Sequence, residues 1–581
     1  MSTAAVTPES YAQTRSRLEP VSVALSLLIL TYVTVWNLTR AHFMADTNVY
    51  TQAILNHQYG TASLDYHSLE SNPFWDFGHI LWRPLGWLCF VICKPVTRIF
   101  AHNNERAEVI LTLIGLNFFA ALACVFFFFQ LARRIIGTDW TAAFVTLALF
   151  SADAFLNYAH SGSPYVVGLA CLVVGMYVSV CKGTEANLSR HVLLSAVMYA
   201  LAVLFWLPYV FVLLTAVAAP VLIYRNERWR RRFAAQTVVA CAVIGLAVYG
   251  SAVVALRIRD MADLRDWVLA AGHGHMQAGG TRVVARLGFS VPRSFINMRR
   301  DGMWLKRYLV HDPYAAVSFR ELFRLSLWKL VLFYASVAVV CMELLRTRRG
   351  QILILLLASA VLPVFIFAVF IFEAGSIERY LPLYPFAFVV CGYVLAAEHA
   401  KVASKVLLVV ALVATAVVNV NAMRRGTLES VKAGAISRIQ HLVPLLGPNS
   451  LVMAVNEQDN LAEFRQNFPL DEINLSGQWQ NYDMLEINTE RLATWREDFA
   501  KQVLVTWRRG GSVWLPERIF CSRPHPKWNW VEGDDNRVRW ADLPLFFGRF
   551  ETGTKIGGED GFVLLEDSAK NKQILILTKR K

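Results

Sequence analysis

The residues best suited to chemistry follow the first long apolar segment of the chain. Asp46 comes a few residues after that segment, with Tyr50 close behind it. A carboxylate beside a cavity at the membrane surface can act as a general base on an acceptor hydroxyl or amine. The alternative is an aspartate that faces water or caps a short helix.

The same stretch continues with more polar groups. Asp76 and His79 come first, and Arg83 follows directly before Pro84. A guanidinium matches a phosphate with two parallel hydrogen bonds, so Arg83 is a candidate for holding a lipid phosphate. The alternative is an arginine that reaches lipid headgroups without specificity. Asp76 and His79 are further candidates for a substrate site.

Later segments add polar groups at the ends of apolar runs. Asp153 and His160 lie around a short turn, and Arg379-Tyr380 begins a late apolar segment. An arginine and a tyrosine there can stabilise a phosphate leaving group, or they can anchor the chain at the membrane surface.

Two histidines in a long polar loop could bind a metal. His273 and His275 are separated by one glycine, and such a pair can share a metal ion only in an extended segment. No third ligand is identifiable. A divalent metal is therefore a candidate cofactor, and no cofactor is assigned.

The composition shows what must position these residues. The chain has 581 residues, of which 55% are hydrophobic and 17% charged, whereas soluble domains carry about 25% charged residues. The apolar residues form blocks of about 20, the length of a membrane span. About eleven spans are predicted, near residues 20–40, 109–131, 140–158, 164–181, 191–224 (two short spans broken at Pro208), 233–257, 326–345, 351–373, 379–398 and 405–423.

The arginine clusters predict the orientation of the spans. The net charge of +14 is concentrated in short loops such as Arg133-Arg134, Arg225–Arg232 and Arg346–Arg349. Such loops are typically cytoplasmic. No basic stripe falls in a soluble segment, so a nucleic-acid partner is not indicated. In the favoured topology, segment 80–100 does not cross the membrane. The rival topology crosses there and treats 191–224 as one span.

Three regions follow from this topology. Residues 1–19 are predicted to be a cytoplasmic tail, and residues 20–423 a transmembrane domain. Its long loops, 41–108 and 258–325, lie on the outer face. Residues 424–581 have the composition of a small extracytoplasmic α/β domain.

The tail contains recognisable local patterns. Leu451–Val455, Ser512–Leu515 and Ile574–Leu577 read as strands, and Asn488–Arg509 reads as an amphipathic helix. Gly510 is suited to end that helix. Together these patterns predict a polytopic α-helical membrane protein with a small C-terminal α/β domain.

The order of the polar elements resembles a known superfamily. It comprises Asp46 with Tyr50, Arg83-Pro84, the turn Arg133–Gly137 after a span, and the late element Arg379–Pro385. Over roughly residues 20–400 this order resembles the GT-C superfamily of lipid-linked-sugar glycosyltransferases. Within it, the protein O-mannosyltransferase and lipid A aminoarabinose transferase branch is the most similar.

The resemblance implies roles and partners. It implies that Asp46 is the catalytic carboxylate, that Arg83 binds the donor phosphate, and that Arg379 and Tyr380 lie near the donor. It also implies a polyprenyl-phosphate sugar as donor, a glycan, lipid or protein as acceptor, and a bacterial inner membrane with the tail domain in the periplasm or otherwise outside.

The sequence departs from the superfamily pattern in two places. Trp82 stands where the aminoarabinose transferases have a glutamate, and Ser163-Pro164 stands where many relatives have an acid. Asp153 and Asp76 are candidates for the missing second carboxylate.

The hypothesis from sequence is an inverting transfer of a sugar to an acceptor on the outer face. A transporter or flippase is the main rival, and it would need charged groups near the middle of the spans. A non-catalytic envelope assembly protein is the other.

Overall fold

The computed structural model describes residues 8–41, 44, 46–60, 74–101, 103–182, 187–224, 229–271, 281–298, 301–371, 375–424, 441–447, 449–454, 482–486, 494–524, 538–557 and 561–579. The chain forms two compact units. The membrane unit comprises Met1–Asn297 and Lys329–Arg425, and the tail unit comprises Met298–Trp328 and Gly426–Lys581.

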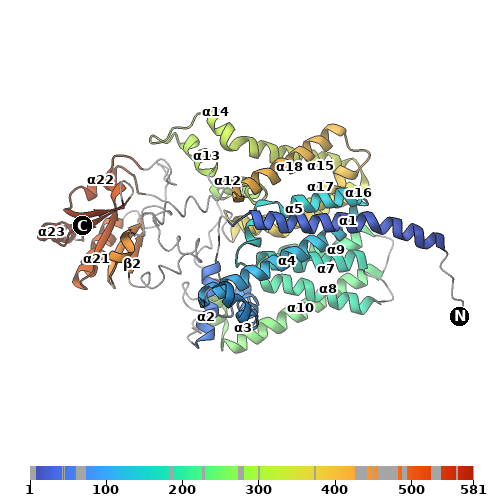
Figure 1. Ribbon diagram of the computed structural model, residues 1–581, viewed down its shortest axis with the longest axis horizontal. Coiled ribbons are helices and arrows are strands. Elements are labelled where there is room, and N and C mark those ends of the chain that lie inside the picture. The colour runs from blue at the N-terminus through green and yellow to red at the C-terminus, as the bar shows by residue number, and fades with distance from the viewer. Residues whose placement is uncertain are drawn as a thin grey trace. The chain divides into compact units, whose positions relative to one another are not determined.

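The membrane unit is built from helices (Figure 1). Its α-helices are α1 (Pro8–Leu38), α2 (Thr47–Gln58), α3 (Trp82–Phe100), α4 (Glu105–Ile136), α5 (Asp139–Phe150), α6 (Asp153–Ala159), α7 (Tyr165–Tyr177), α8 (Leu188–Phe205), α9 (Val210–Ile223), α10 (Trp229–Ala255), α11 (Met261–Ala270), α12 (Thr281–Phe295), α15 (Trp328–Leu345), α16 (Arg348–Phe370), α17 (Tyr384–Ala396) and α18 (Val402–Arg424). Short helices of other types are η1 (Phe77–His79), η2 (Val178–Lys182), η4 (Leu207–Tyr209) and η6 (Ile377–Leu383).

Many of these helices can cross a membrane. Among the described residues, eight are long and apolar enough, and the bent pair α5–α6 brings the number to nine if it forms one span. Two shorter apolar helices, Tyr165–Cys181 and Leu207–Ile223, lie where the sequence predicts further spans. Helix α3 is outside this set, and its charged residues include Arg83 and Lys94. The chain is a multi-pass membrane protein.

Local sequence explains where the central helix α4 begins and ends. The Asn104 side chain accepts a hydrogen bond from the backbone N–H of Ala107 and so caps the first turn. Gly137 ends the helix at φ 91°, a conformation that glycine adopts without a steric penalty. Helix α4 then packs against α3, α5 and α7, and α8 packs between α7 and α10.

The break predicted at Pro208 is present. Helix α8 ends at Phe205, and α9 begins at Val210 after the single turn η4. A second break lies between α5 and α6, whose axes differ by 67°. These breaks matter because both adjoin the polar residues of the candidate site.

The tail unit combines a sheet with flanking helices (Figure 1). Its elements are α13 (Asp301–Val310), α14 (Phe319–Leu322), η5 (Phe323–Leu327), η7 (Val443–Leu445), β1 (Ser450–Ala454), β2 (Tyr482–Glu486), α21 (Trp495–Arg508), β3 (Val513–Pro516), η9 (Glu517–Phe520), α22 (Asp542–Phe547), β4 (Thr552–Ile556), β5 (Phe562–Leu565) and α23 (Ala569–Lys579). The strand order is β2-β1-β3-β5-β4. Strand β1 pairs in parallel with β2 and β3, whereas β5 pairs antiparallel with β3 and β4.

The sequence pattern correctly identifies the core helix of the tail unit. Trp495, Phe499, Val503 and Trp507 recur every four residues, and all four are buried on α21. The predicted start of this helix, near residue 488, lies outside the described residues. The predicted fold class, a polytopic helical membrane protein with a small α/β domain, is confirmed.

The strand predicted at Ile574–Leu577 is wrong. These residues belong to the helix α23, which packs against α21. Leu575 is fully buried, whereas Ile576 and Leu577 are about half exposed. A short apolar run has no periodicity that separates a strand from a helix, and here packing on α21 decides for the helix.

We predict that Asn571→Ala destabilises the tail unit by about 2–3 kcal/mol. The buried Asn571 side chain accepts from the Glu551 N–H (2.9 Å) and donates to the carbonyls of Glu551 and Glu566 (both 2.8 Å). Its removal takes this partner from the Glu551 N–H and the Glu566 carbonyl, and it leaves the Glu551 carbonyl with the Glu566 N–H at 3.3 Å. Full-length protein should therefore be cleaved within the tail at a lower temperature during limited proteolysis.

The matched control is Lys570→Ala, one residue away. Lys570 is 60% exposed and forms only a surface ion pair with Glu551 at 3.3 Å, an interaction that is typically worth less than 1 kcal/mol. Equal sensitivity of the two variants to protease would contradict the prediction.

Candidate functional site

The turn between α6 and α7 brings the start of α2 against the membrane helices. The Gly162 N–H donates to the Thr47 hydroxyl, and the Trp82 indole donates to the Gly162 carbonyl, both at 2.9 Å. The Asn117 amide of α4 donates to two further carbonyls of the turn at 2.8 and 2.9 Å. These bonds fix the residue before α2, which is Asp46.

Asp46 is an exposed carboxylate held by two phenols. Its Oδ2 accepts hydrogen bonds from the hydroxyls of Tyr165 (3.1 Å) and Tyr50 (3.5 Å). Although Asp46 directly precedes α2, its side chain makes no capping bond to that helix. No donor in the described part of the chain binds Oδ1. That oxygen is therefore available to accept a proton from another molecule.

A chain of polar contacts runs from Asp46 to a buried ion pair. The Tyr50 hydroxyl also lies 3.4 Å from His79 Nε2, and His79 Nδ1 lies 3.7 Å from Asp76 Oδ1. Asp76 Oδ2 pairs with Arg83 Nη2 at 3.0 Å, and Asp76 Oδ1 accepts from the Gly78 N–H. Burial raises the pKa of Tyr50 well above its ordinary value, so its hydroxyl remains a hydrogen-bond donor.

Arg83 differs from its expected role as a phosphate ligand. Its side chain is fully buried, it is paired with Asp76, and its guanidinium lies 5.6 Å from the centre of the Tyr50 ring. This arrangement offers no exposed surface to a phosphate. Arg83 instead fixes Asp76 and Tyr50, and through them the polar chain that leads to Asp46.

A second charged pair, Glu378 and Arg379, is connected to Asp46 through aromatic side chains. The Tyr158 hydroxyl donates to Glu378 Oε2 at 2.7 Å, and Glu378 Oε1 lies 3.9 Å from Arg379 Nε. The Arg379 guanidinium lies 5.9 Å from the Trp206 ring centre. Both Tyr158 and Trp206 pack edge-on against Tyr165 at 4.8 Å, and Tyr165 is the residue that binds Asp46.

Of the late Arg379-Tyr380 pair, only Arg379 contributes an exposed side chain to the site. Arg379 keeps an 11% exposed side chain, whereas Tyr380 is fully buried beside Phe365. Sequence reasoning missed Glu378, Tyr158 and Tyr165. Only Glu378 carried a signal, because an acid directly before an arginine in an apolar segment needs a partner.

Two predicted site residues lie in other contacts. Asp153 accepts a hydrogen bond from the Asn297 amide at 2.9 Å. His160 is buried, stacks on Trp36, and binds the Thr39 hydroxyl through Nε2 at 2.8 Å. These contacts place both side chains in the packing between helices of the membrane unit.

The predicted metal ligands His273 and His275 lie outside the described residues. Within the described residues, no group of three or more histidine, cysteine or acidic side chains is placed to hold a metal ion.

Comparison with known proteins gives structural neighbours only. No protein-family model matches the sequence, and no curated protein is similar to it. The structure aligns with ArnT, the lipid A aminoarabinose transferase of Cupriavidus metallidurans, bound to undecaprenyl phosphate. That alignment has 11% identity and a TM-score of 0.47, and covers 94% of this chain and 98% of ArnT.

A second neighbour is the oligosaccharyltransferase of Archaeoglobus fulgidus. Its complex with Zn and sulfate aligns with 11% identity and a TM-score of 0.49 over 93% of this chain and 72% of the other. Its complex with an inhibitory peptide and a dolichol-phosphate aligns with a TM-score of 0.43 and 11% identity over 94% and 74%. Both neighbours are GT-C proteins, the superfamily that the sequence resembles. At these identities and TM-scores, function has to be inferred from the side chains.

Those side chains form a site with a base and a cation. Asp46 offers a carboxylate oxygen that binds no donor among the described residues, and Arg379 offers a partly exposed guanidinium. The Tyr165 hydroxyl binds Asp46, and the Tyr165 ring packs against Trp206, which lies beside Arg379. The pair can deprotonate a nucleophile and stabilise a departing anion.

We predict that His160 makes stability depend on pH. Burial, and to a lesser extent nearby Arg40, lowers the pKa of His160 to about 3. The unfolded chain takes up this proton near pH 6.5, so stability that is present above that pH is lost as the pH falls towards 3. One such group costs about 2 kcal/mol between pH 7 and pH 5.

The variant His160→Gln cannot take up this proton. The gap in unfolding temperature between wild type and variant should therefore be wide at pH 7 and narrow at pH 5. His441→Gln, at an exposed position of the tail unit, serves as control and should leave a constant gap. A constant gap for His160→Gln would show that His160 does not titrate in this way.

Proposed function

We propose that this chain is a membrane glycosyltransferase that moves a sugar from a polyprenyl-phosphate donor to an acceptor on the extracytoplasmic face. One observation carries the proposal. The hydroxyls of Tyr165 and Tyr50 hold the exposed carboxylate of Asp46. The Tyr165 ring also packs against Tyr158, which binds Glu378, and against Trp206, which lies beside Arg379. A base and a cation thus share one small region.

The chemistry needs only these two charges. Asp46 removes the proton from an acceptor hydroxyl or amine as that group attacks the anomeric carbon. The new bond forms as the bond from the anomeric carbon to the phosphate oxygen breaks, and its electron pair leaves with the polyprenyl phosphate. The leaving group is already a good one, so it needs a positive charge and no proton donor.

Arg379 is the residue to which we assign the phosphate. Its side chain is 11% exposed, and its Nε lies 3.9 Å from Glu378, whereas Arg83 is fully buried in a 3.0 Å pair with Asp76. Arg83 acts as a positioning residue in this proposal.

The length of α4 supports an extracytoplasmic site. Asn117 of α4 binds the turn beside Asp46, and Arg133 and Arg134 occupy the last turn of the same helix. The sixteen-residue separation places these arginines about 24 Å further along the axis. Arginines at span ends favour the cytoplasm, which leaves the Asp46 end outside. We further assign the protein to a bacterial inner membrane, with the tail unit outside.

We predict that Asp46→Asn lowers turnover at least about 10²-fold. The amide keeps the shape of the carboxylate and can still accept from Tyr165, but it cannot take a proton. Binding of the donor should change little. Release of polyprenyl phosphate from a panel of polyprenyl-phosphate sugars, with purified protein, measures turnover and also identifies the sugar.

Asp260→Asn is the matched control. Asp260 is another exposed aspartate before a helix, and it caps α11 by accepting from the N–H groups of Ala262 and Asp263. It should keep wild-type turnover. Near-normal turnover of Asp46→Asn would rule out Asp46 as the base.

We predict a different effect for substitutions of Arg379. Arg379→Gln should lower kcat/KM by about 10²–10³, because the charge on the leaving phosphate loses its partner. Arg379→Lys should recover part of the loss, since lysine supplies the charge without the two-pronged geometry. Arg232→Gln, at an exposed arginine of α10, should have no effect. The assignment fails if Arg379→Gln and Arg232→Gln behave alike.

A further inference from the structure

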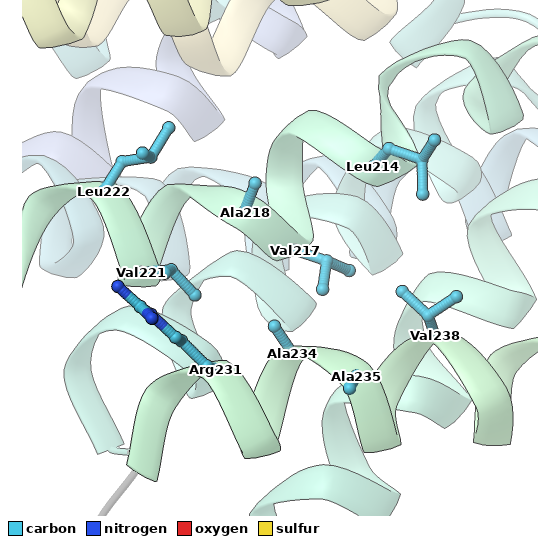
Figure 2. A pocket seen from close by; sticks show the side chains of 9 residues that line it. All are labelled: Leu214, Val217, Ala218, Val221, Leu222, Arg231, Ala234, Ala235 and Val238. Carbon is cyan, nitrogen blue, oxygen red and sulfur yellow. The ribbon is translucent and has the colours of Figure 1, made fainter. Parts of the chain in front are cut away.

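A groove between α9 and α10 lies apart from the candidate site. It has a volume of about 470 Å³, within the range of small-ligand sites. Figure 2 shows Leu214 and Val238 at one end of the groove, and Leu222 and Arg231 at the other. Every lining residue except Arg231 is apolar.

The shape of the groove suits a hydrocarbon chain. Leu214 and Leu222 are eight residues apart on one helix, which corresponds to about 12 Å. The small side chains Ala218 and Ala235 leave the space between the two helices open (Figure 2). The groove is therefore an open, apolar hollow along the two helices, with a single charge at one end.

Two neighbouring arginines at this end of the groove have different surroundings. The neighbouring Arg230 is buried, donates to the Ser179 carbonyl at 3.2 Å, and lies 4.1 Å from the Tyr224 ring centre. Arg231 is exposed and makes no ion pair or hydrogen bond with any residue that the structure describes. The stretch Arg225–Arg232 contains five arginines and one glutamate, so it attracts anions.

We propose that this groove binds one anionic glycerophospholipid, with an acyl chain between α9 and α10 and the headgroup phosphate on Arg231. An aliphatic chain matches the apolar walls, and the guanidinium provides a bidentate partner for a phosphate. A net negative headgroup is favoured over a zwitterionic one because Arg231 belongs to a sequence stretch of net positive charge.

This site is independent of sugar transfer. Tyr249, near the far end of α10, donates to the Phe77 carbonyl in η1, next to Asp76 and His79. Arg231 lies eighteen residues earlier, about 27 Å away along the helix. A lipid in the groove therefore touches none of the residues assigned to the reaction, and either proposal can fail without the other.

Native mass spectrometry of the purified full-length chain tests the proposal, with equimolar phosphatidylglycerol and phosphatidylcholine added. Wild type should retain one phosphatidylglycerol in preference to phosphatidylcholine. Arg231→Gln should lower phosphatidylglycerol retention about fivefold, equivalent to about 1 kcal/mol, with little effect on phosphatidylcholine. Ala235→Phe, at an exposed position, should fill the groove and lower retention of both lipids.

Arg232→Gln is the control, because Arg232 is an equally exposed neighbour outside the groove. It should retain phosphatidylglycerol as wild type does. Three results would overturn the site: equal retention by Arg231→Gln and wild type, an equal loss in Arg232→Gln, or unchanged retention in Ala235→Phe. Equal retention of the two lipids by wild type would overturn the headgroup assignment.

Discussion

Unpaired backbone groups are too costly to leave inside a membrane protein, and this constraint shapes the candidate site. The turn between α6 and α7 interrupts the helical pattern, and side chains satisfy its peptide groups. Asn117, Trp82 and Thr47 bind them from α4, α3 and α2. A Cβ at Gly162 would lie 2.6 Å from Thr47, so only glycine allows this approach. The same bonds that close the turn therefore place α2 and Asp46.

The buried pair of Asp76 and Arg83 extends this constraint to charge. Neither side chain could be buried alone, because an uncompensated ion in an apolar interior costs several kcal/mol. The Asp76 side chain is only 2% exposed and the Arg83 side chain is fully buried. The Gly78 N–H donates a further hydrogen bond to Asp76. A charge pair of this kind is weak evidence for net stability, but it fixes geometry. Here it fixes His79 and Tyr50, and the Tyr50 hydroxyl in turn contacts Asp46.

Sequence reasoning succeeded where the signal is local and failed where it is long-range. Apolar blocks and the spacing of Phe499 and Val503 correctly gave the membrane helices and α21. Asp46 was recognisable as an isolated carboxylate beside a span. Tyr165, however, binds Asp46 from 119 residues away, and Tyr158 meets Glu378 across 220 residues. A tyrosine in an apolar segment gives no sign of such a partner, and no pattern in the chain reveals that Arg83 is already paired.

Interrupted helices give the site its position. The bend between α5 and α6, the break between α8 and α9 at η4, and the short helix η6 contact one another or α7. Tyr158, Trp206 and Glu378 come from these three interruptions, and all lie around Tyr165. Membrane proteins tolerate broken helices where the freed backbone is buried in protein or lines a cavity, and substrate sites often form there. Straight helices would have carried Tyr158, Trp206 and Glu378 past one another, whereas these breaks gather them around Tyr165, the residue that binds Asp46.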